Sequence, residues 1–183
     1  MNIRDLFRKS VPMRTRAICA LGLMMLAAGD GNPKSGGPVS PPAGGDQSSL
    51  SRPMLTAHNE VRARAHLPPL KWSDQLAAYA QQWGNTLLAR RKFYHRPNSP
   101  YGENLFMIKN GRVKPGEVVA DWASESRNYS YRSNSCHGMC THYTQLVWRS
   151  TQRVGCAVAR GGGNEVWVCY YDPRGNVIGR KPY

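Results

Sequence analysis

Apolar residues recur at helical spacing in four segments of the chain. The first covers residues 55–65, and a Pro-Pro pair ends it. The second follows an N-cap residue at Ser73 and ends near Arg90. Its apolar positions are Leu76, Ala80, Trp83 and Leu87. Two shorter segments, 115–127 and 141–148, complete the set of predicted helices.

Towards the end of the chain the apolar period changes from helical to alternating. Residues 153–160 and 165–171 are rich in β-forming side chains. The loop Gly161-Gly162-Gly163-Asn164 separates them, which is a hairpin signal. Helices followed by an antiparallel hairpin predict an α+β fold or a layered α-β-α domain.

The first 29 residues carry the pattern of an export signal. Residues 1–16 hold five Lys or Arg residues against Asp5, and residues 17–28 are apolar and uncharged. This apolar run is shorter than the roughly 20 residues that a membrane span requires. We expect cleavage near Gly29, after Ala27-Ala28. An uncleaved N-terminal anchor is the alternative.

Residues 30–50 are rich in Gly and Pro and contain almost no large apolar side chains. Such a stretch cannot bury enough surface to offset its ordering entropy, so we expect a flexible linker. The folded domain is therefore predicted to cover residues 51–183, which is long enough for one core.

The chain is strongly basic, with a formal net charge of +14. Removal of residues 1–29 leaves 20 Lys and Arg residues against 10 Asp and Glu residues. This balance favours attraction to anionic surfaces, although solubility alone is an alternative explanation. No basic stripe with interleaved aromatic residues is present, so we expect no nucleic-acid partner. The mature protein is expected to have no stable transmembrane segment.

Four cysteines remain after the predicted export signal, and an even number in an exported chain favours disulfides. If the hairpin loop is residues 161–164, Arg160 faces Glu165 and Cys156 faces Cys169. Facing Cβ atoms lie about 4.5–5.5 Å apart, near the reach of a disulfide. By elimination, Cys136 and Cys140 pair locally.

A zinc cluster is the alternative for that local pair. The spacing resembles that of zinc ligands at Cys136, His137, Cys140 and His142, but export makes the disulfide the favoured interpretation.

Five phrases of the sequence together resemble the CAP superfamily, the cysteine-rich secretory, antigen 5 and pathogenesis-related protein 1 group. They occur in family order and cover essentially all of residues 51–183. The phrases are His58-Asn59-Glu60-Val61-Arg62 with Leu67-Pro68-Pro69-Leu70-Lys71-Trp72, Tyr101-Gly102-Glu103-Asn104-Leu105, Trp122-Ala123-Ser124-Glu125, His142-Tyr143-Thr144-Gln145-Leu146-Val147-Trp148, and Val166-Trp167-Val168-Cys169-Tyr170-Tyr171-Asp172-Pro173-Arg174-Gly175-Asn176. The sequence is most similar in character to plant pathogenesis-related protein 1. It departs from the family at Tyr170, where a polar residue such as Asn is usual.

The resemblance implies a three-layer α-β-α sandwich with a cleft that gathers four residues. These are His58, Glu103, Glu125 and His142. Two neutral imidazoles, here His58 and His142, are good ligands for zinc or another divalent cation. Alone, His58 would be interpreted as a structural helix histidine. His66 and His95 are expected on the surface.

The resemblance also implies a secreted or periplasmic protein that binds lipid, sterol or an anionic surface without catalysing a reaction. Trp122, Tyr129 and Tyr131 are interpreted as core and cleft-edge packing, with lipid contact as the alternative. The competing function is a metal-assisted hydrolase or protease that uses the same cleft. HExxH, Walker and Gly-x-Ser-x-Gly motifs are absent from the sequence.

The C-terminal tail, residues 173–183, is expected to pack Val177, Ile178 and Tyr183 against the domain. In plant relatives a peptide of this position and kind is released as a defence signal, which is the alternative for this tail.

Overall fold

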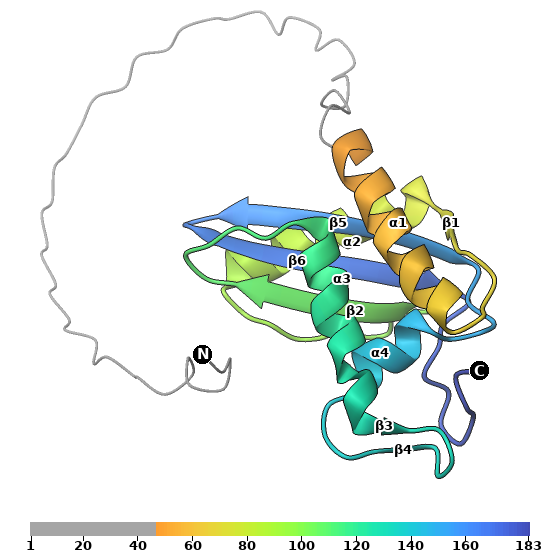
Figure 1. Cartoon of the computed structure of the whole chain (residues 1–183). Coiled ribbons are helices and arrows are strands. Elements are labelled where there is room, and N and C mark those ends of the chain that lie inside the picture. Colours follow the sequence, from red (N-terminus) through yellow and green to blue (C-terminus); the bar gives the residue numbers. More distant parts are fainter. Residues whose placement is uncertain (1–46) are drawn as a thin grey trace, which may run out of the picture. The chain divides into compact units, whose positions relative to one another are not determined.

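The computed structural model describes residues 47–183, whose helices and strands are arranged in layers (Figure 1). The helices are α1 (Gln47–Arg64), α2 (Asp74–Arg90), α3 (Pro115–Ser124), the 3₁₀ helix η2 (Glu125–Asn128) and α4 (Thr141–Leu146). The main strands are β1 (Lys71–Trp72), β2 (Gly102–Ile108), β5 (Arg153–Gly161) and β6 (Asn164–Asp172). A small ribbon pairs β3 (Tyr129–Ser130) with β4 (Ser135–Cys136). The predicted export signal lies outside the described residues.

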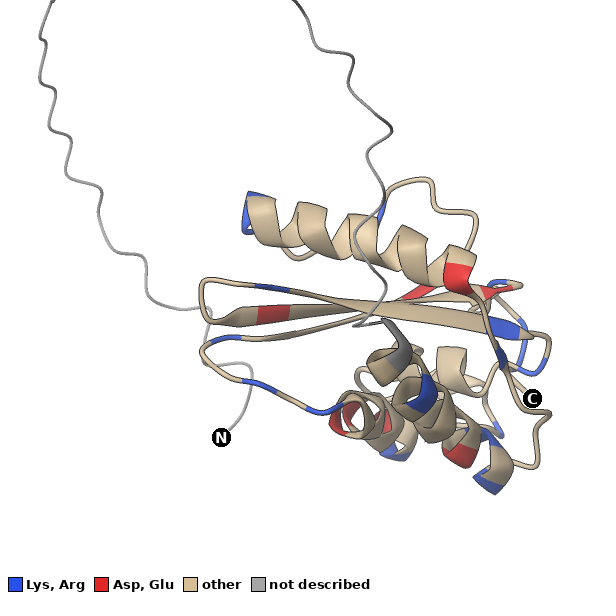
Figure 2. Cartoon of the chain, turned by 90° about the horizontal axis from the view of Figure 1, so that it is seen from above, with Lys and Arg blue, Asp and Glu red and all other residues tan. Residues whose placement is uncertain are grey.

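The four main strands form one sheet in the order β1-β5-β6-β2. Strand β1 runs parallel to β5, and the other pairs are antiparallel. Helix α2 covers one face of this sheet, and α1, α3 and α4 cover the other (Figure 2). The predicted three-layer α-β-α sandwich is therefore confirmed. Within residues 47–183, no helix is both long and apolar enough to cross a bilayer.

The helices form where the apolar spacing predicts them, but their ends differ. The N-cap at Ser73 is as expected, since its side chain accepts a hydrogen bond from the Leu76 amide. Helix α1 begins at Gln47, inside the stretch predicted as linker, because Leu50 is buried in the core. The predicted helix 115–127 ends at Ser124 and continues as the 3₁₀ turn η2.

The β5–β6 hairpin has the register that the sequence predicts. Its ladder extends one pair further, to Gly161 and Asn164, so the turn itself is the two residues Gly162 and Gly163. Both have positive φ, 55° and 79°, a conformation that costs a glycine little. Cys156 faces Cys169 and forms the disulfide with it. A second disulfide joins Cys136 to Cys140, as expected, so these sulfurs do not form a zinc cluster.

Helix α2 lies very close to the sheet where β5 carries a glycine. A Cβ atom at Gly155 would collide with the backbone of Ser73 and Ala77. The absence of a side chain at this position therefore allows the first turn of α2 to pack directly on the strand.

A buried cation ties the other helical layer together. Arg62, in the last turn of α1, is fully buried, and its guanidinium donates hydrogen bonds to four main-chain carbonyl groups. The acceptors, at 2.8–3.3 Å, are the carbonyls of Pro68, Leu146, Trp148 and Thr151. They belong to the loop after α1, the end of α4 and the loop before β5. Burial lowers the pKa of Arg62 to about 10, so the group stays charged at neutral pH.

His58 belongs to a second buried network, one helical turn before Arg62. Its Nδ1 donates to the carbonyl of Met54 at 2.7 Å, and its Nε2 accepts from the Tyr171 hydroxyl at 2.9 Å. The Asn104 amide donates in turn to that hydroxyl and to the carbonyl of His142. Burial lowers the pKa of His58 to about 4, so its imidazole is neutral in the folded protein.

The tail after β6 only partly packs on the domain. Tyr183 packs against the core, as expected, and its ring stacks on Tyr131 at 5.0 Å. Val177 and Ile178 do not pack: 40% and 100% of their surfaces are exposed. The expectation for these two side chains is therefore wrong.

We predict that Arg62→Lys lowers the free energy of unfolding by about 2–4 kcal/mol. A lysine has one ammonium group and cannot reach four carbonyl groups, so buried acceptors lose their partners. Urea denaturation measures the change. Arg64→Lys, at an exposed position on the same helix, should stay within about 0.5 kcal/mol of the wild type. Equal stability of the two variants would contradict the assigned role of Arg62.

A pH dependence follows from the depressed pKa of His58. The unfolded state takes up a proton near pH 6.5 and the folded state only near pH 4. The contribution of the neutral, buried His58 to the free energy of unfolding is therefore complete above about pH 6.5. It is lost as the pH falls towards 4, and the total loss is on the order of 2–3 kcal/mol. In His58→Gln the free energy of unfolding should change less over this window. Identical pH slopes for the two proteins would contradict the prediction.

Candidate functional site

Two separate histidine–glutamate pairs occupy the region where the sequence predicts one group of four. In the first, His142 Nδ1 lies 2.7 Å from Glu125 Oε1. The other carboxylate oxygen, Glu125 Oε2, accepts from the main-chain amides of His142 and Tyr143 at the start of α4. The His142 ring stacks on Trp122, with centroids 6.1 Å apart and planes at 25°. These contacts fix the imidazole and leave Nε2 without a hydrogen bond in the described part of the chain.

The second pair joins His95 to Glu103. His95 Nδ1 lies 2.5 Å from Glu103 Oε1, and this hydrogen bond raises the pKa of His95. The His95 side chain is 67% exposed, whereas Glu103 is 5% exposed. The buried carboxylate of Glu103 therefore orients an exposed imidazole through its Nδ1.

Glu103 is held by more than the histidine. Its Oε2 accepts from the Tyr170 hydroxyl at 2.5 Å, and its carboxylate accepts from the Arg96 amide. Tyr170 is fully buried, and burial together with the bond to Glu103 raises its pKa. Tyr170, the departure from the family pattern, therefore anchors the carboxylate of this pair.

The structure does not bring His58 to either pair. Both of its ring nitrogens are engaged in the core, and the Trp122 ring packs against both His58 and His142. His95, expected as an ordinary surface residue, is the imidazole that Glu103 contacts. The one sequence signal for it was its position eight residues before Glu103, in the loop that leads into β2.

His58 lies close to the sulfur atoms of two cysteines. Its ring nitrogen and the sulfurs of Cys156 and Cys169 lie within 4.8 Å of one another, which is the spacing of a His/Cys metal group. Both sulfurs are joined in the disulfide, however, and metal ligation requires thiolates. The group could take an ion only after reduction and rearrangement of the core.

A polar cavity of about 330 Å³ opens beside His95 and Glu103. Arg174 and Asn176 of the tail and Gln145 of α4 also line this cavity. His142 and Glu125 are not among the residues that line this cavity.

The largest of the described cavities is a groove of about 650 Å³ between α1 and α3. Small apolar side chains form one part of its lining: Val61, Ala65, Ala120 and Ala123. Polar and aromatic side chains form another: Arg64, His66, Ser124, Ser126, Tyr143 and Tyr183. We call this feature the α1–α3 groove.

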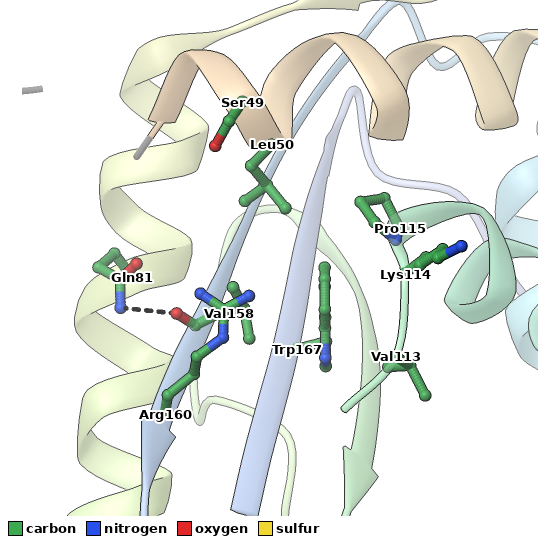
Figure 3. A pocket seen from close by; sticks show the side chains of 9 residues that line it. All are labelled: Ser49, Leu50, Gln81, Val113, Lys114, Pro115, Val158, Arg160 and Trp167. Carbon is green, nitrogen blue, oxygen red and sulfur yellow. Dashed lines mark hydrogen bonds between the residues drawn. The ribbon is translucent and has the colours of Figure 1, made fainter. Parts of the chain in front are cut away.

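A third cavity, of about 210 Å³, lies near the beginning of α1 (Figure 3). Trp167 presents its ring to this space beside Leu50 and Val158, and Arg160 borders it. Arg160 is also paired with the buried carboxylate of Glu165, which accepts from the Trp167 indole. Because Arg160 and the Trp167 indole already interact with Glu165, this cavity is the weakest candidate for a functional site.

The three aromatic residues singled out in the sequence have different environments. Trp122 is fully buried and donates its indole N–H to the Leu105 carbonyl, so it is a core residue. Tyr129 is half-buried and Tyr131 is 45% exposed. Tyr131 reaches the α1–α3 groove only indirectly, through its stacking on Tyr183.

Comparison with known proteins gives consistent results. Pathogenesis-related protein 1 of Arabidopsis thaliana is 41% identical over 130 residues, covering 70% of this chain and 80% of the relative. The structure of Schistosoma mansoni venom allergen-like protein 4 covers 73% of this chain and 92% of its own, with a TM-score of 0.62 and 27% identity.

A crystal structure of NaASP2 with Zn²⁺ covers 74% of this chain and 85% of its own, with a TM-score of 0.62. Its 22% identity supports the fold alone. Residues 55–171 of the chain match the family described as "CAP: Cysteine-rich secretory protein family". With the α-β-α sandwich and the two disulfides described above, these matches show that the chain belongs to the CAP family of cysteine-rich secretory and pathogenesis-related 1 proteins.

Proposed function

We propose that this protein is an exported binding module that holds an amphiphilic lipid with an anionic head, such as a fatty acid, in the α1–α3 groove. The observation that carries the proposal is the lining of that groove. Its volume of about 650 Å³ lies in the range of ligand pockets, about 300–1,000 Å³. It combines small apolar side chains with the cationic side chain of Arg64.

The two kinds of lining residue suit the two ends of such a ligand. Val61, Ala65, Ala120 and Ala123 offer short side chains, which leave room for an acyl chain between the helices. The exposed Arg64 guanidinium can pair with a carboxylate, and His66 lies beside it. A lipid is therefore favoured over a polar metabolite.

Export is supported by three independent features. The chain begins with the charge and apolar pattern of a signal sequence. Both disulfides require an oxidising compartment to form and persist. The chain also belongs to a family described as secretory.

We further propose that the two histidine–glutamate pairs are the divalent-metal site of this protein, with zinc as the ion. The donor chemistry fits: in each pair a carboxylate engages Nδ1 and leaves Nε2 available, the arrangement usual around zinc-bound histidine. His95 and His142 would hold the ion, and Glu103 and Glu125 would orient them. Bound zinc supplies Lewis acidity. The zinc in the similar NaASP2 structure is consistent with this choice.

Ala120→Phe should weaken binding of a fluorescent long-chain fatty acid by at least about tenfold, because the larger ring fills the α1–α3 groove. Titration of the ligand, followed by fluorescence, measures the affinity. Ala63→Phe makes the same change at an exposed position of α1 outside the groove and should bind as the wild type does. Wild-type affinity in Ala120→Phe would exclude the groove as the site.

His95→Ala and His142→Ala should each weaken zinc binding by about tenfold or more, and the double variant should bind none detectably. Isothermal titration calorimetry at neutral pH measures this. His66→Ala is the control, since His66 is exposed and has no carboxylate partner among the described residues. Unchanged zinc binding in the double variant would remove both pairs as the metal site. Peptide hydrolysis that depends on zinc and on His95 would instead favour the hydrolase alternative.

A further inference from the structure

A turn in the C-terminal tail displays two apolar side chains to solvent. Ile178 is completely exposed, and its neighbour Val177 is 40% exposed. Single exposed apolar residues are common on proteins and need no explanation by themselves. This pair differs because the backbone holds it in place and cationic residues flank it in the sequence. We call residues 176–180 the tail turn.

The tail turn is closed by its own backbone. The Arg180 amide donates to the Val177 carbonyl at 3.1 Å, so Val177 and Ile178 lie within a closed turn. The residues on either side, Asn176 and Gly179, have positive φ of 54° and 78°. Asn and Gly are the residues that adopt this conformation most readily. The local sequence therefore favours this turn.

The rest of the domain fixes the tail turn on both sides. At its first residue, the Asn176 side chain accepts from the Thr144 hydroxyl at 2.7 Å and donates to the Thr141 carbonyl at 2.9 Å. After it, the buried Pro182 accepts from the Arg149 amide at 2.6 Å. The final residue, Tyr183, stacks on Tyr131. The two apolar side chains are thus presented from a structured segment that is anchored to α4 and to the core.

Cations surround these apolar side chains in the sequence, and acids do not. Arg174, Arg180 and Lys181 are all exposed, and residues 173–183 contain no Asp or Glu. The nearest acid along the chain, Asp172, is already paired with Arg153. An apolar tip among cations matches the interface of an anionic bilayer, which has apolar chains beneath negatively charged headgroups.

We propose that the tail turn docks this protein on anionic membranes. Val177 and Ile178 enter the headgroup region, and Arg174, Arg180 and Lys181 contact lipid phosphates. This inference goes beyond lipid binding in the α1–α3 groove and does not require it. It would bring the groove near its source of lipid, because Tyr183, five residues after Ile178, lines the groove.

Flotation with lipid vesicles tests the proposal on the chain without its predicted export signal. The wild type should bind vesicles of phosphatidylcholine with phosphatidylglycerol more tightly than vesicles of phosphatidylcholine alone, and added salt should weaken this binding. Ile178→Asp should lower partitioning by about tenfold, because it removes an apolar side chain and adds a repelled charge. Phe93→Asp adds the same charge at another exposed apolar residue, 41% exposed and outside the tail, and should lose no more than about twofold.

Two further variants separate the tail turn from the groove. Ile178→Trp should be quenched by brominated lipid more strongly than the wild type, since the new indole enters the bilayer. Ala120→Phe should keep its vesicle binding even if it loses fatty-acid binding.

Three results would overturn the docking proposal. One is a wild type that binds neither kind of vesicle, which would leave a protein receptor as the partner of the tail turn. Another is equal loss of binding in Ile178→Asp and Phe93→Asp. The last is vesicle binding that Ala120→Phe abolishes and Ile178→Asp does not affect, which would assign membrane contact to the groove.

Discussion

The guanidinium of Arg62 is the interaction on which the arrangement of α1 and α4 depends. Carbonyl groups at helix ends and in buried loops need donors, and here one side chain supplies four. Because the group is planar and charged, it holds the acceptors in a fixed relation to one another. The α1–α3 groove takes Val61 and Ala65 from the residues around Arg62 and Tyr143 from α4. Arg62 therefore helps to position the α1 and α4 residues of the groove, although it does not line the groove.

Strand β2 explains why Glu103 and the buried network of His58 lie on opposite faces of the sheet. Neighbouring residues of a strand point to opposite faces of a sheet. Glu103 points to the α2 side, where it meets Tyr170, and Asn104 points to the other side, where it meets Tyr171 and the carbonyl of His142. Since β2 is at the edge of the sheet, the two faces meet around it. The departure at Tyr170 adds a hydroxyl that fixes the carboxylate on the α2 side.

Much of the fold could be predicted from the sequence, because apolar spacing and turn chemistry are local signals. The pairing of Cys156 with Cys169 follows from the position of one glycine turn. The site was less predictable, because its residues come from segments far apart in the chain. His58 lies in a family phrase and His95 does not, yet His95 has the exposed imidazole beside Glu103. What distinguishes the two histidines is the burial of His58 in helix α1 and the contacts of His95 in a loop. Neither property leaves a periodic pattern in the sequence. The exposure of Ile178 was missed for a related reason, since an apolar residue in a tail is expected to pack unless the turn that displays it is known.

The order of the sheet has one more consequence. Strand β1 pairs only with Arg153 and Val154, so the rest of the outer edge of β5 has no strand beside it among the described residues. Such an edge is a template on which a second molecule can add a strand, the first step towards aggregation. The amide of Gln81 in α2 reaches over this edge to the carbonyl of Val158 (Figure 3). The Gln81 side chain thus occupies a backbone acceptor that an added strand would need. It thereby helps to prevent a second molecule from extending this sheet.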